Sequence, residues 1–251
     1  MKLKKIFETA RKFRRIIYRS RCAAVIVAAG SSNRMGGQDK LLANLDGKSV
    51  LARTLEAFET CQMVDEIIVV TRADRLEEIG AVCALYQKVR IVVPGGETRT
   101  DSVMAGIAAV SKKMSLVAVH DGARPLVTQE VICAAIEKAA KFGAAAPAIA
   151  VKDTIKVKRG NAVDHTPDRS TLCAIQTPQV FDCDLLRGAL QNAKNKNIAV
   201  TDDCSAVEAL GMTVFVTEGS EENIKITTPL DLDLAAAILN RRKADADRTR
   251  L

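Results

Sequence analysis

The segment AAVIVAAGSSNRMGGQDK, residues 23–40, carries the strongest fold signal in the chain. Residues 23–28 are small and apolar without interruption, and their valines and isoleucine favour an extended backbone, so they predict a strand buried on both faces. Residues 29–32 then have little side-chain bulk, which lets backbone N–H groups approach a ligand closely. Arg34 and Lys40 add positive charge beside this turn. The segment therefore predicts a site for an anion, most simply a nucleoside triphosphate.

The familiar phosphate-binding loops do not fit this turn. A dinucleotide fingerprint needs glycine at its first, third and sixth positions, and here Gly30 is followed by Ser32 and Met35. A P-loop ends in Gly-Lys-Ser/Thr, which residues 36–38 do not match. The segment instead resembles that of nucleotidyltransferases that move a nucleoside monophosphate onto a phosphorylated sugar or alcohol. An ordinary strand-turn-helix with solvated cations is the alternative.

Strands and helices alternate in the predicted pattern of the first 151 residues. The predicted strands are 23–28, 66–70, 89–93, 116–119 and 145–151, and the predicted helices are 49–60, 74–86, 100–113 and 128–142. Short buried strands between amphipathic helices indicate an α/β fold, namely a Rossmann-like, doubly wound, mainly parallel sheet with helices on both faces. Ligands bind outside the carboxyl ends of such strands, so the residues that follow each strand are the candidate site.

The second half of the chain differs in texture. Residues 151–180 alternate β-branched and polar residues around a turn at 159–161, which predicts a hairpin arm over about 151–176 that projects from the sheet. A two-stranded arm is marginal in water alone, so we expect a second subunit to support it in a homodimer. Further helices are predicted at 182–194, 203–210 and 229–242, with a strand at 212–217 and a charged C-terminal tail at 243–251.

Residues 1–21 differ in charge from the rest. The chain has 251 residues with 37 Lys and Arg against 30 Asp and Glu, and residues 1–21 hold nine of the basic residues and a single acid, Glu8. The remainder thus has 28 basic and 29 acidic residues. An apolar stripe at helical spacing runs through this basic segment, at Leu3, Ile6, Phe7, Ala10, Phe13 and Ile17. We expect a basic amphipathic N-terminal extension that binds an anionic membrane surface or an acidic partner; docking onto the chain's own body or a disordered tail are the alternatives.

Composition excludes several functional classes. Aromatic residues make up 3% of the chain and tryptophan is absent, which argues against a base-stacking nucleic-acid surface. The seven cysteines are scattered without a C-x-x-C pair and indicate a reducing cytosol, and two histidines make a zinc site improbable. Apolar runs fall short of the ~20 residues of a membrane span. We expect a cytoplasmic protein, with residues 1–21 as a candidate for peripheral attachment to the inner membrane surface.

Polar residues suited to nucleotide binding follow the predicted third strand in PGGETRTDS, residues 94–102. Gly95 and Gly96 let backbone groups face a base, Arg99 can reach a phosphate, and Ser102 can hydrogen-bond a base edge. The same residues also suit a strand-to-helix turn capped by Thr100 or Asp101.

The motif HDGARP, residues 120–125, follows the predicted fourth strand. A carboxylate there is costly to desolvate unless it meets a cation or hydroxyl, so Asp121 suits Mg²⁺ or a ribose, and Arg124 suits a substrate phosphate. A structural Asp121–Arg124 ion pair is the alternative, and we interpret His120 as structural or orienting. Lys225 lies between two isoleucines and is hard to explain as a solvated residue, although its side chain could reach solvent. Near residue 201, Asp202 or Asp203 could simply cap a helix.

Nine motifs in order, spread over residues 28–232, resemble those of the 2-C-methyl-D-erythritol 4-phosphate cytidylyltransferase family: AAGSSNRM, DKLL, PGGETRTDSV, HDGARP, VKDTIK, PDR, QTPQVF, TDDCSAVE and NIKITTPLDL. The resemblance implies transfer of CMP from CTP to 2-C-methyl-D-erythritol 4-phosphate with release of pyrophosphate, in non-mevalonate isoprenoid precursor biosynthesis. It also implies Mg²⁺ with CTP and a homodimer whose arms reach into each other's sites. The cytidylyltransferase domain would span residues 22–242, and residues 1–21 lie outside the family pattern.

The resemblance also implies roles for matching residues. Catalytic cations would be Arg34, Lys40 and Lys225; nucleotide-binding residues would be Ala28, Ala29, Gly30, Gly96, Glu97, Ser102 and Asp121. Acceptor-binding residues would be Asp121, Arg124, Thr154, Arg169, Thr201 and Lys225. Direct metal ligation by the protein is not expected, with Asp121 as the candidate if there is any. Two alternatives stay open, a ribitol 5-phosphate cytidylyltransferase and a catalytically idle nucleotide-binding or scaffold protein, although the joint presence of the cations argues against the second.

Overall fold

A computed structural model describes residues 20–30 and 39–249. The predicted N-terminal extension up to residue 19, and Arg34, lie outside the described residues. Within the described ranges, none of the helices has the length and apolar character needed to cross a membrane.

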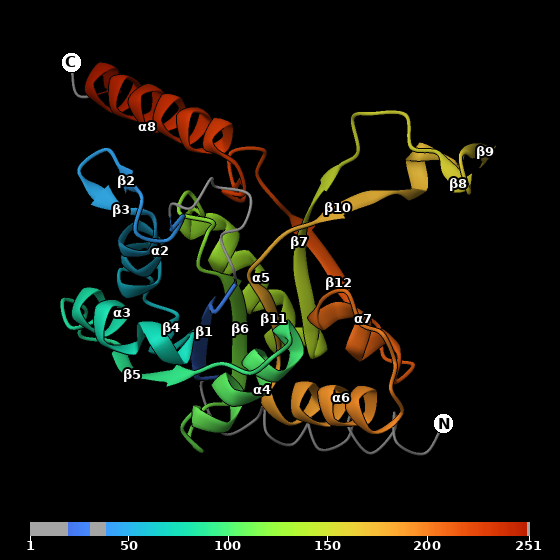
Figure 1. The fold of residues 1–251 in the computed structure, drawn as a ribbon, viewed down its shortest axis with the longest axis horizontal. Helices are drawn as coiled ribbons and strands as arrows, with labels where there is room; N and C mark the ends of the chain where they lie inside the picture. The colour runs from blue at the N-terminus through green and yellow to red at the C-terminus, as the bar shows by residue number, and fades with distance from the viewer. Residues whose placement is uncertain (1–19, 31–38, 250–251) are drawn as a thin grey trace.

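Four parallel strands form one side of the sheet, with β5 at its edge (Figure 1). They are β1 (Cys22–Ala28), β4 (Val64–Thr71), β5 (Val89–Pro94) and β6 (Leu116–Asp121), with β1 between β4 and β6 and β5 beyond β4. All residues of β1 are buried except Val27, which is partly buried. The side chains of β1 alternate between two separate cores, with Ala24 and Ile26 in one and Ala23 and Val25 in the other. The predicted strand buried on both faces is confirmed.

Shorter strands of mixed direction extend the sheet beyond β6. β11 (Gln179–Asp182) lies antiparallel between β6 and β7 (Ala144–Ala150), and β12 (Phe215–Glu218) pairs in parallel with β7. β10 (Cys173–Ile175) pairs antiparallel with the last residues of β7. Residues 173–175, within the predicted arm of about 151–176, thus bond to the main sheet rather than to the hairpin.

Helices cover both faces of the sheet. One core packs α2 (Val50–Glu59), α3 (Leu76–Cys83) and α5 (Gln129–Phe142) against the sheet, and the other packs α4 (Arg99–Ala109), α6 (Cys183–Asn195) and α7 (Asp203–Glu208). A short 3₁₀ turn, η2 (Ala73–Arg75), precedes α3. This arrangement confirms the predicted α/β, doubly wound fold with helices on both faces.

A third core lies outside these two layers. Helix α8 (Pro229–Thr249) packs Ala235 and Ile238 against Leu45 of a small hairpin formed by β2 (Asn44–Leu45) and β3 (Lys48–Ser49). The helix continues seven residues past the predicted end at 242, so most of the predicted charged tail is helical. Lys243 in this extension pairs with Asp46 at a nitrogen–oxygen distance of 2.7 Å. That ion pair attaches the extended end of α8 to the β2–β3 hairpin.

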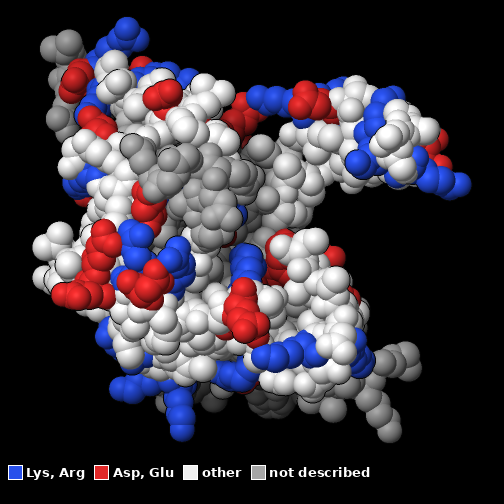
Figure 2. Space-filling view, viewed as in Figure 1, with Lys and Arg blue, Asp and Glu red and all other residues white. Residues whose placement is uncertain are grey.

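The predicted arm projects from the body as a separate lobe (Figures 1 and 2). Its hairpin consists of β8 (Val157–Arg159) and β9 (Ala162–His165), joined at Gly160, whose φ is +61°. A 3₁₀ turn, η3 (Arg169–Thr171), follows before the chain returns to the sheet. Acidic and basic side chains interleave along the arm (Figure 2). The turn predicted at 159–161 is thus confirmed.

Candidate active site

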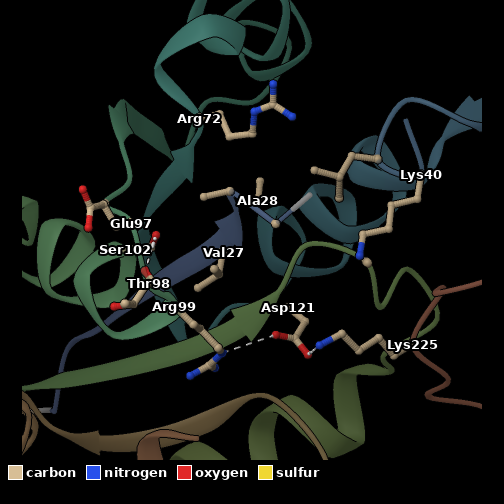
Figure 3. A pocket seen from close by; sticks show the side chains of 15 residues that line it. Val27, Ala28, Lys40, Arg72, Glu97, Thr98, Arg99, Ser102, Asp121 and Lys225 are labelled. Carbon is tan, nitrogen blue, oxygen red and sulfur yellow. Dashed lines mark hydrogen bonds and ion pairs between the residues drawn. The ribbon is translucent and has the colours of Figure 1, made fainter. Parts of the chain in front are cut away.

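A cavity of about 450 Å³ opens at the carboxyl ends of the parallel strands (Figure 3). It is lined by residues that follow β1, β4, β5 and β6, together with Lys225 from the segment before α8. The lining residues are Val27, Ala28, Ala29, Gly30, Lys40, Leu41, Arg72, Gly96, Glu97, Thr98, Arg99, Ser102, Asp121, Ala123 and Lys225. This is the edge at which doubly wound sheets bind ligands.

The wall formed after β5 is tightly packed around its two glycines. A Cβ at Gly96 would lie 2.3 Å from the Asp101 Cβ, and one at Gly95 would lie 2.6 Å from the Ser102 Oγ. Thr98 caps α4 by accepting a hydrogen bond from the Asp101 N–H at 3.0 Å. The sequence-based assignment of this cap to Thr100 or Asp101 is therefore wrong, because the helix begins at Arg99. Little room remains for any residue but glycine at 95 and 96.

Asp121, at the end of β6, is surrounded by three cationic side chains. Its Oδ2 lies 2.9 Å from Lys225 Nζ and 3.5 Å from Arg124 Nε, and its Oδ1 lies 4.0 Å from Arg99 Nε. Burial acts to raise the pKa of this carboxyl, but Lys225, Arg99 and Arg124 together lower it to about 2. Asp121 is therefore ionised at neutral pH, and the surrounding cations exceed it in charge.

Backbone hydrogen bonds fix the loops that carry these groups. Gly122 N–H donates to the Val27 carbonyl at 2.9 Å, which attaches the HDGARP loop to the end of β1. Ile226 N–H donates to the Ala123 carbonyl at 2.8 Å, which holds Lys225 beside Asp121. A Cβ at Gly122 would lie 3.1 Å from the Val27 oxygen, so this close approach favours glycine.

His120 is fully buried and acts as a support for the site. Its Nε2–H donates to the Arg124 carbonyl at 3.1 Å, and its Nδ1 lies 3.0 Å from the Thr177 hydroxyl, which also accepts the Asp121 N–H at 3.1 Å. The ring packs on Phe58 with a centroid distance of 4.8 Å. Burial lowers the pKa of His120 to about 4, so the ring is neutral and orients its neighbours. The interpretation of His120 as a structural or orienting residue agrees with these contacts.

Arg99 links the cavity to a buried acid. Its Nη2 donates to Asp203 Oδ2 at 2.8 Å, and the Asp203 side chain is 1% exposed. Burial raises the pKa of Asp203, and the Arg99 charge opposes that rise. Asp202, one residue earlier, caps α7 through Ser205, as one alternative had suggested.

The structure brings most of the predicted site residues to this cavity. Ala28, Ala29, Gly30, Lys40, Gly96, Glu97, Ser102, Asp121 and Lys225 all line it. Arg124 is not a lining residue, but its Nε lies 3.5 Å from Asp121 Oδ2 and its Nη1 donates to the Asn223 carbonyl at 2.6 Å. Three predicted acceptor residues lie elsewhere in the chain: Thr154 and Arg169 are exposed on the arm, and Thr201 is exposed just before α7. Figure 1 shows the arm directed away from the body.

Some lining residues were missed from the sequence. Arg72 follows the last residue of β4, and Thr98 and Arg99 begin α4. The sequence signal for Arg72 is its position directly after β4, a buried strand beside β1. In doubly wound sheets, ligands bind at such carboxyl ends of strands. For Arg99, the sequence indicates only that its side chain can reach a phosphate.

The cavity wall offers few groups to a metal ion. Among the described residues, no cluster of three or more His, Cys, Asp or Glu side chains could hold one. Asp121 and Glu97 are carboxylates of the lining, and carboxylate oxygen is the ligand type that Mg²⁺ takes together with substrate phosphates. This donor set fits a metal bound mainly by a nucleotide.

A cation-rich cavity at the carboxyl edge of a doubly wound sheet defines the chain as a Rossmann-like nucleotide-binding α/β protein. The family model described as IspD, 2-C-methyl-D-erythritol 4-phosphate cytidylyltransferase, matches residues 22–241. The chain belongs to this family of nucleotidyltransferases.

Curated relatives and solved structures agree with the family match. The chain is 43% identical to the 2-C-methyl-D-erythritol 4-phosphate cytidylyltransferase of Alkaliphilus oremlandii, over 89% of this chain and 97% of that protein. It is 44% identical to that of Halalkalibacterium halodurans, over 88% and 98%. A crystal structure of 4-diphosphocytidyl-2C-methyl-D-erythritol synthase from Anaerococcus prevotii matches with a TM-score of 0.80 at 33% identity, over 88% of this chain and 96% of that one.

Proposed function

We propose that this chain transfers CMP from CTP to 2-C-methyl-D-erythritol 4-phosphate, releasing pyrophosphate, in non-mevalonate isoprenoid precursor biosynthesis. The observation that carries the proposal is the family match over residues 22–241. The cavity agrees with it, because Lys225, Arg99 and Arg124 lie around Asp121 and outnumber Asp121 and the buried Asp203, so positive charge remains for phosphate groups. The chain is thus an enzyme, a cytidylyltransferase.

The reaction we propose is a direct displacement. An oxygen of the acceptor's phosphate attacks the α-phosphorus of CTP, the new phosphorus–oxygen bond forms, and the bond to the pyrophosphate oxygen breaks. A phosphate dianion is already nucleophilic, so the step needs no general base and no covalent enzyme intermediate. Catalysis then depends on positioning and on neutralising charge. The pKa values of about 2 for Asp121 and about 4 for His120 make both groups weak bases at neutral pH, which agrees with a step in which neither accepts a proton.

In this proposal the residues divide between two sides of the cavity. Ala28, Ala29, Gly30, Gly96, Glu97 and Ser102 surround the cytosine and ribose, with cytosine read mainly by backbone groups. Arg124, Thr201 and Lys225 hold the acceptor, joined by Thr154 and Arg169 from the arm. Asp121 contacts both the nucleotide and the acceptor. Lys40, Lys225 and Arg34 neutralise the charge that develops at the α-phosphate; Arg34 lies outside the described residues.

Mg²⁺ would accompany CTP, since Asp121 could contribute one oxygen and the phosphates the others. When bound, the ion neutralises phosphate charge. Three further predictions remain proposals: a homodimer through the arm, a cytoplasmic location, and an anionic surface or acidic partner for residues 1–21.

The test of the proposed function is release of pyrophosphate from CTP with each of two acceptors, 2-C-methyl-D-erythritol 4-phosphate and ribitol 5-phosphate. We expect turnover with the first and little with the second. Lys225→Ala should lower turnover about 10²-fold, as loss of a partner for developing charge often does. Lys243→Ala is the matched control, because Lys243 lies on α8 outside the cavity, where it pairs with Asp46. Equal turnover of the two acceptors, or an unimpaired Lys225→Ala enzyme, would contradict the proposal.

A further inference from the structure

The buried carboxylate of Asp203 has no part in the roles assigned so far. Its side chain is 1% exposed, and its cationic partner is Arg99, at 2.8 Å between Nη2 and Oδ2. Burying a charge is costly unless it is paired and hydrogen-bonded. A helix cap does not account for it, because Asp202 supplies the cap of α7. The ion pair with Arg99 is therefore what offsets the cost of burying the Asp203 charge.

The Asp203 end of this pair is rigid. Gln179 on β11, itself 3% exposed, accepts hydrogen bonds from the N–H groups of Asp203 and Cys204 at 3.0 and 3.1 Å. Its amide nitrogen donates to Asp202 Oδ2 at 2.7 Å. The sheet thus fixes the backbone of Asp203, whereas the Arg99 side chain is long and 32% exposed. The fixed acid holds the flexible guanidinium.

The guanidinium held in this way stands beside the centre of the site. Arg99 lines the cavity, and its Nε lies 4.0 Å from Asp121 Oδ1, whereas Lys225 approaches Oδ2 at 2.9 Å. Figure 3 shows Arg99 and Lys225 on opposite sides of the Asp121 carboxylate. A guanidinium presents a planar fork of donors that suits phosphate oxygens.

We propose that Arg99 is a further substrate-binding residue, for a phosphate oxygen at the reacting centre, and that Asp203 is the positioning residue that holds it there. The inference rests on the proposed function. The acceptor's phosphate is the source that the contacts favour, because Arg99 lies beside Asp121, which also contacts Lys225 and Arg124, and these three residues contact the acceptor in the proposed function. The α-phosphate of CTP shares this chemistry and is distinguished by the test.

The test measures KM for each substrate and kcat in Arg99→Gln, Asp203→Asn and the double variant. Arg99→Gln should lower kcat/KM for the acceptor about 10-fold or more, with KM for CTP changed less than about 2-fold. Asp203→Asn should change the same constant in the same direction. Because Asp203 acts through Arg99, the double variant should be no worse than Arg99→Gln. If KM for CTP rises instead, the phosphate that Arg99 binds belongs to the nucleotide.

The matched control is Asp184→Asn. Asp184 on α6 also pairs with an arginine, Arg187, at 2.9 Å between Oδ1 and Nη1, but this pair is exposed and does not line the cavity. We expect kinetic constants near those of the unchanged chain. Arg99→Lys should recover part of the loss, since it restores charge without the fork. Thermal unfolding of each variant gives the folded fraction used to correct kcat.

Three results would overturn the inference. The first is unchanged KM values and kcat per folded molecule in Arg99→Gln. The second is effects of the two single variants that multiply in the double variant. The third is an Asp184→Asn enzyme as impaired as Asp203→Asn. An unchanged chain inactive on both acceptors would contradict the proposed function instead. In that case, calorimetry that compares the affinity for inorganic phosphate of the unchanged chain and of Arg99→Gln tests the inference by itself.

Discussion

His120 shows how burial sets the chemistry of a single residue. Its Nδ1 accepts a hydrogen bond from the Thr177 hydroxyl, which itself accepts the Asp121 N–H. Burial of the ring disfavours the charged imidazolium and lowers the pKa of His120 to about 4. The neutral ring therefore supports Thr177, and through it the backbone position of Asp121.

Stability should therefore fall in mild acid through His120. The folded pKa of about 4 lies below the unfolded value near 6.5, so the unfolded chain takes up the proton first. The contribution is complete above pH 6.5 and is lost as the pH falls toward 4. Between pH 7 and pH 5 it should cost about 2 kcal/mol of unfolding free energy. Urea unfolding of the unchanged chain and of His120→Gln at both values measures it; His165→Gln, at an exposed histidine, should keep the full decline.

Gly96 is a residue at which a single methyl group should affect nucleotide binding. A Cβ there would lie 2.3 Å from the Asp101 Cβ in the first turn of α4, so Gly96→Ala must displace the wall of the cavity. We expect KM for CTP to rise about 10-fold, since small displacements of binding groups cost this much or more. Gly80→Ala on α3, where a Cβ meets nothing within 4 Å, is the control. An unchanged KM in Gly96→Ala would show that this wall does not contact the nucleotide.

Site residues could be predicted individually when they lie just after a strand or within a known motif, and not when their role depends on a long-range contact. Asp121, Gly96 and Lys40 could be assigned to a site because they follow apolar runs or belong to a recognisable motif. The Arg99–Asp203 pair joins residues 104 positions apart, and neither spacing nor hydrophobic period reports such a contact. The cap of α4 was misplaced because three of four consecutive residues, Thr98, Thr100 and Asp101, are all good capping types.

At the level of elements, strong periodicity gave the right result and short antiparallel pieces did not. The parallel strands were predicted because each contains an apolar run rich in β-branched residues. Strands β1, β4 and β6 are largely buried on both faces, whereas β5 at the sheet edge is partly exposed. β11 has only four residues, and its insertion between β6 and β7 depends on a chain reversal that no local pattern records. The β2–β3 hairpin could have been found from Asp46-Gly47, a pair with positive φ angles of 54° and 82° that suits a two-residue hairpin turn.

Helix α4 contacts the sheet through a glycine, which allows a prediction about packing. A Cβ at Gly106 would lie 2.5 Å from Val25 Cγ1 and 2.8 Å from Val70 Cγ2. Gly106→Ala should therefore destabilise the fold by about 1–3 kcal/mol through overpacking, although alanine favours helices. Gly188→Ala on α6 has no atom within 4 Å and should stabilise by about 0.5–1 kcal/mol. Denaturant unfolding of both variants checks the pair; equal shifts of the same sign would contradict this account of helix–sheet packing.

At the scale of the whole molecule, the arm is the feature that a single chain does not explain. Val157 and Val163 of its hairpin are 40% and 62% exposed, and Ile155 just before it is 41% exposed. A two-stranded hairpin is marginally stable alone, so these apolar side chains favour a packing partner. The Arg169 guanidinium donates to the Lys152 carbonyl at 3.0 Å within the arm and does not line the cavity of its own chain. A second copy of the chain could receive it.

A mixture of two inactive variants tests this arrangement. In a symmetric dimer whose sites combine Lys40 of one copy with Arg169 of the other, a hybrid of Arg169→Ala and Lys40→Ala chains contains one site with both residues intact. Random exchange of subunits should restore about a quarter of the activity of the unchanged protein, measured as pyrophosphate release. Mixing Lys40→Ala with Lys225→Ala is the control, because both residues line the same cavity and their hybrids should regain nothing. Subunit exchange is verified with two distinguishable tags; if exchange occurs without recovery, Arg169 does not act across the subunit boundary and the site is built within one chain.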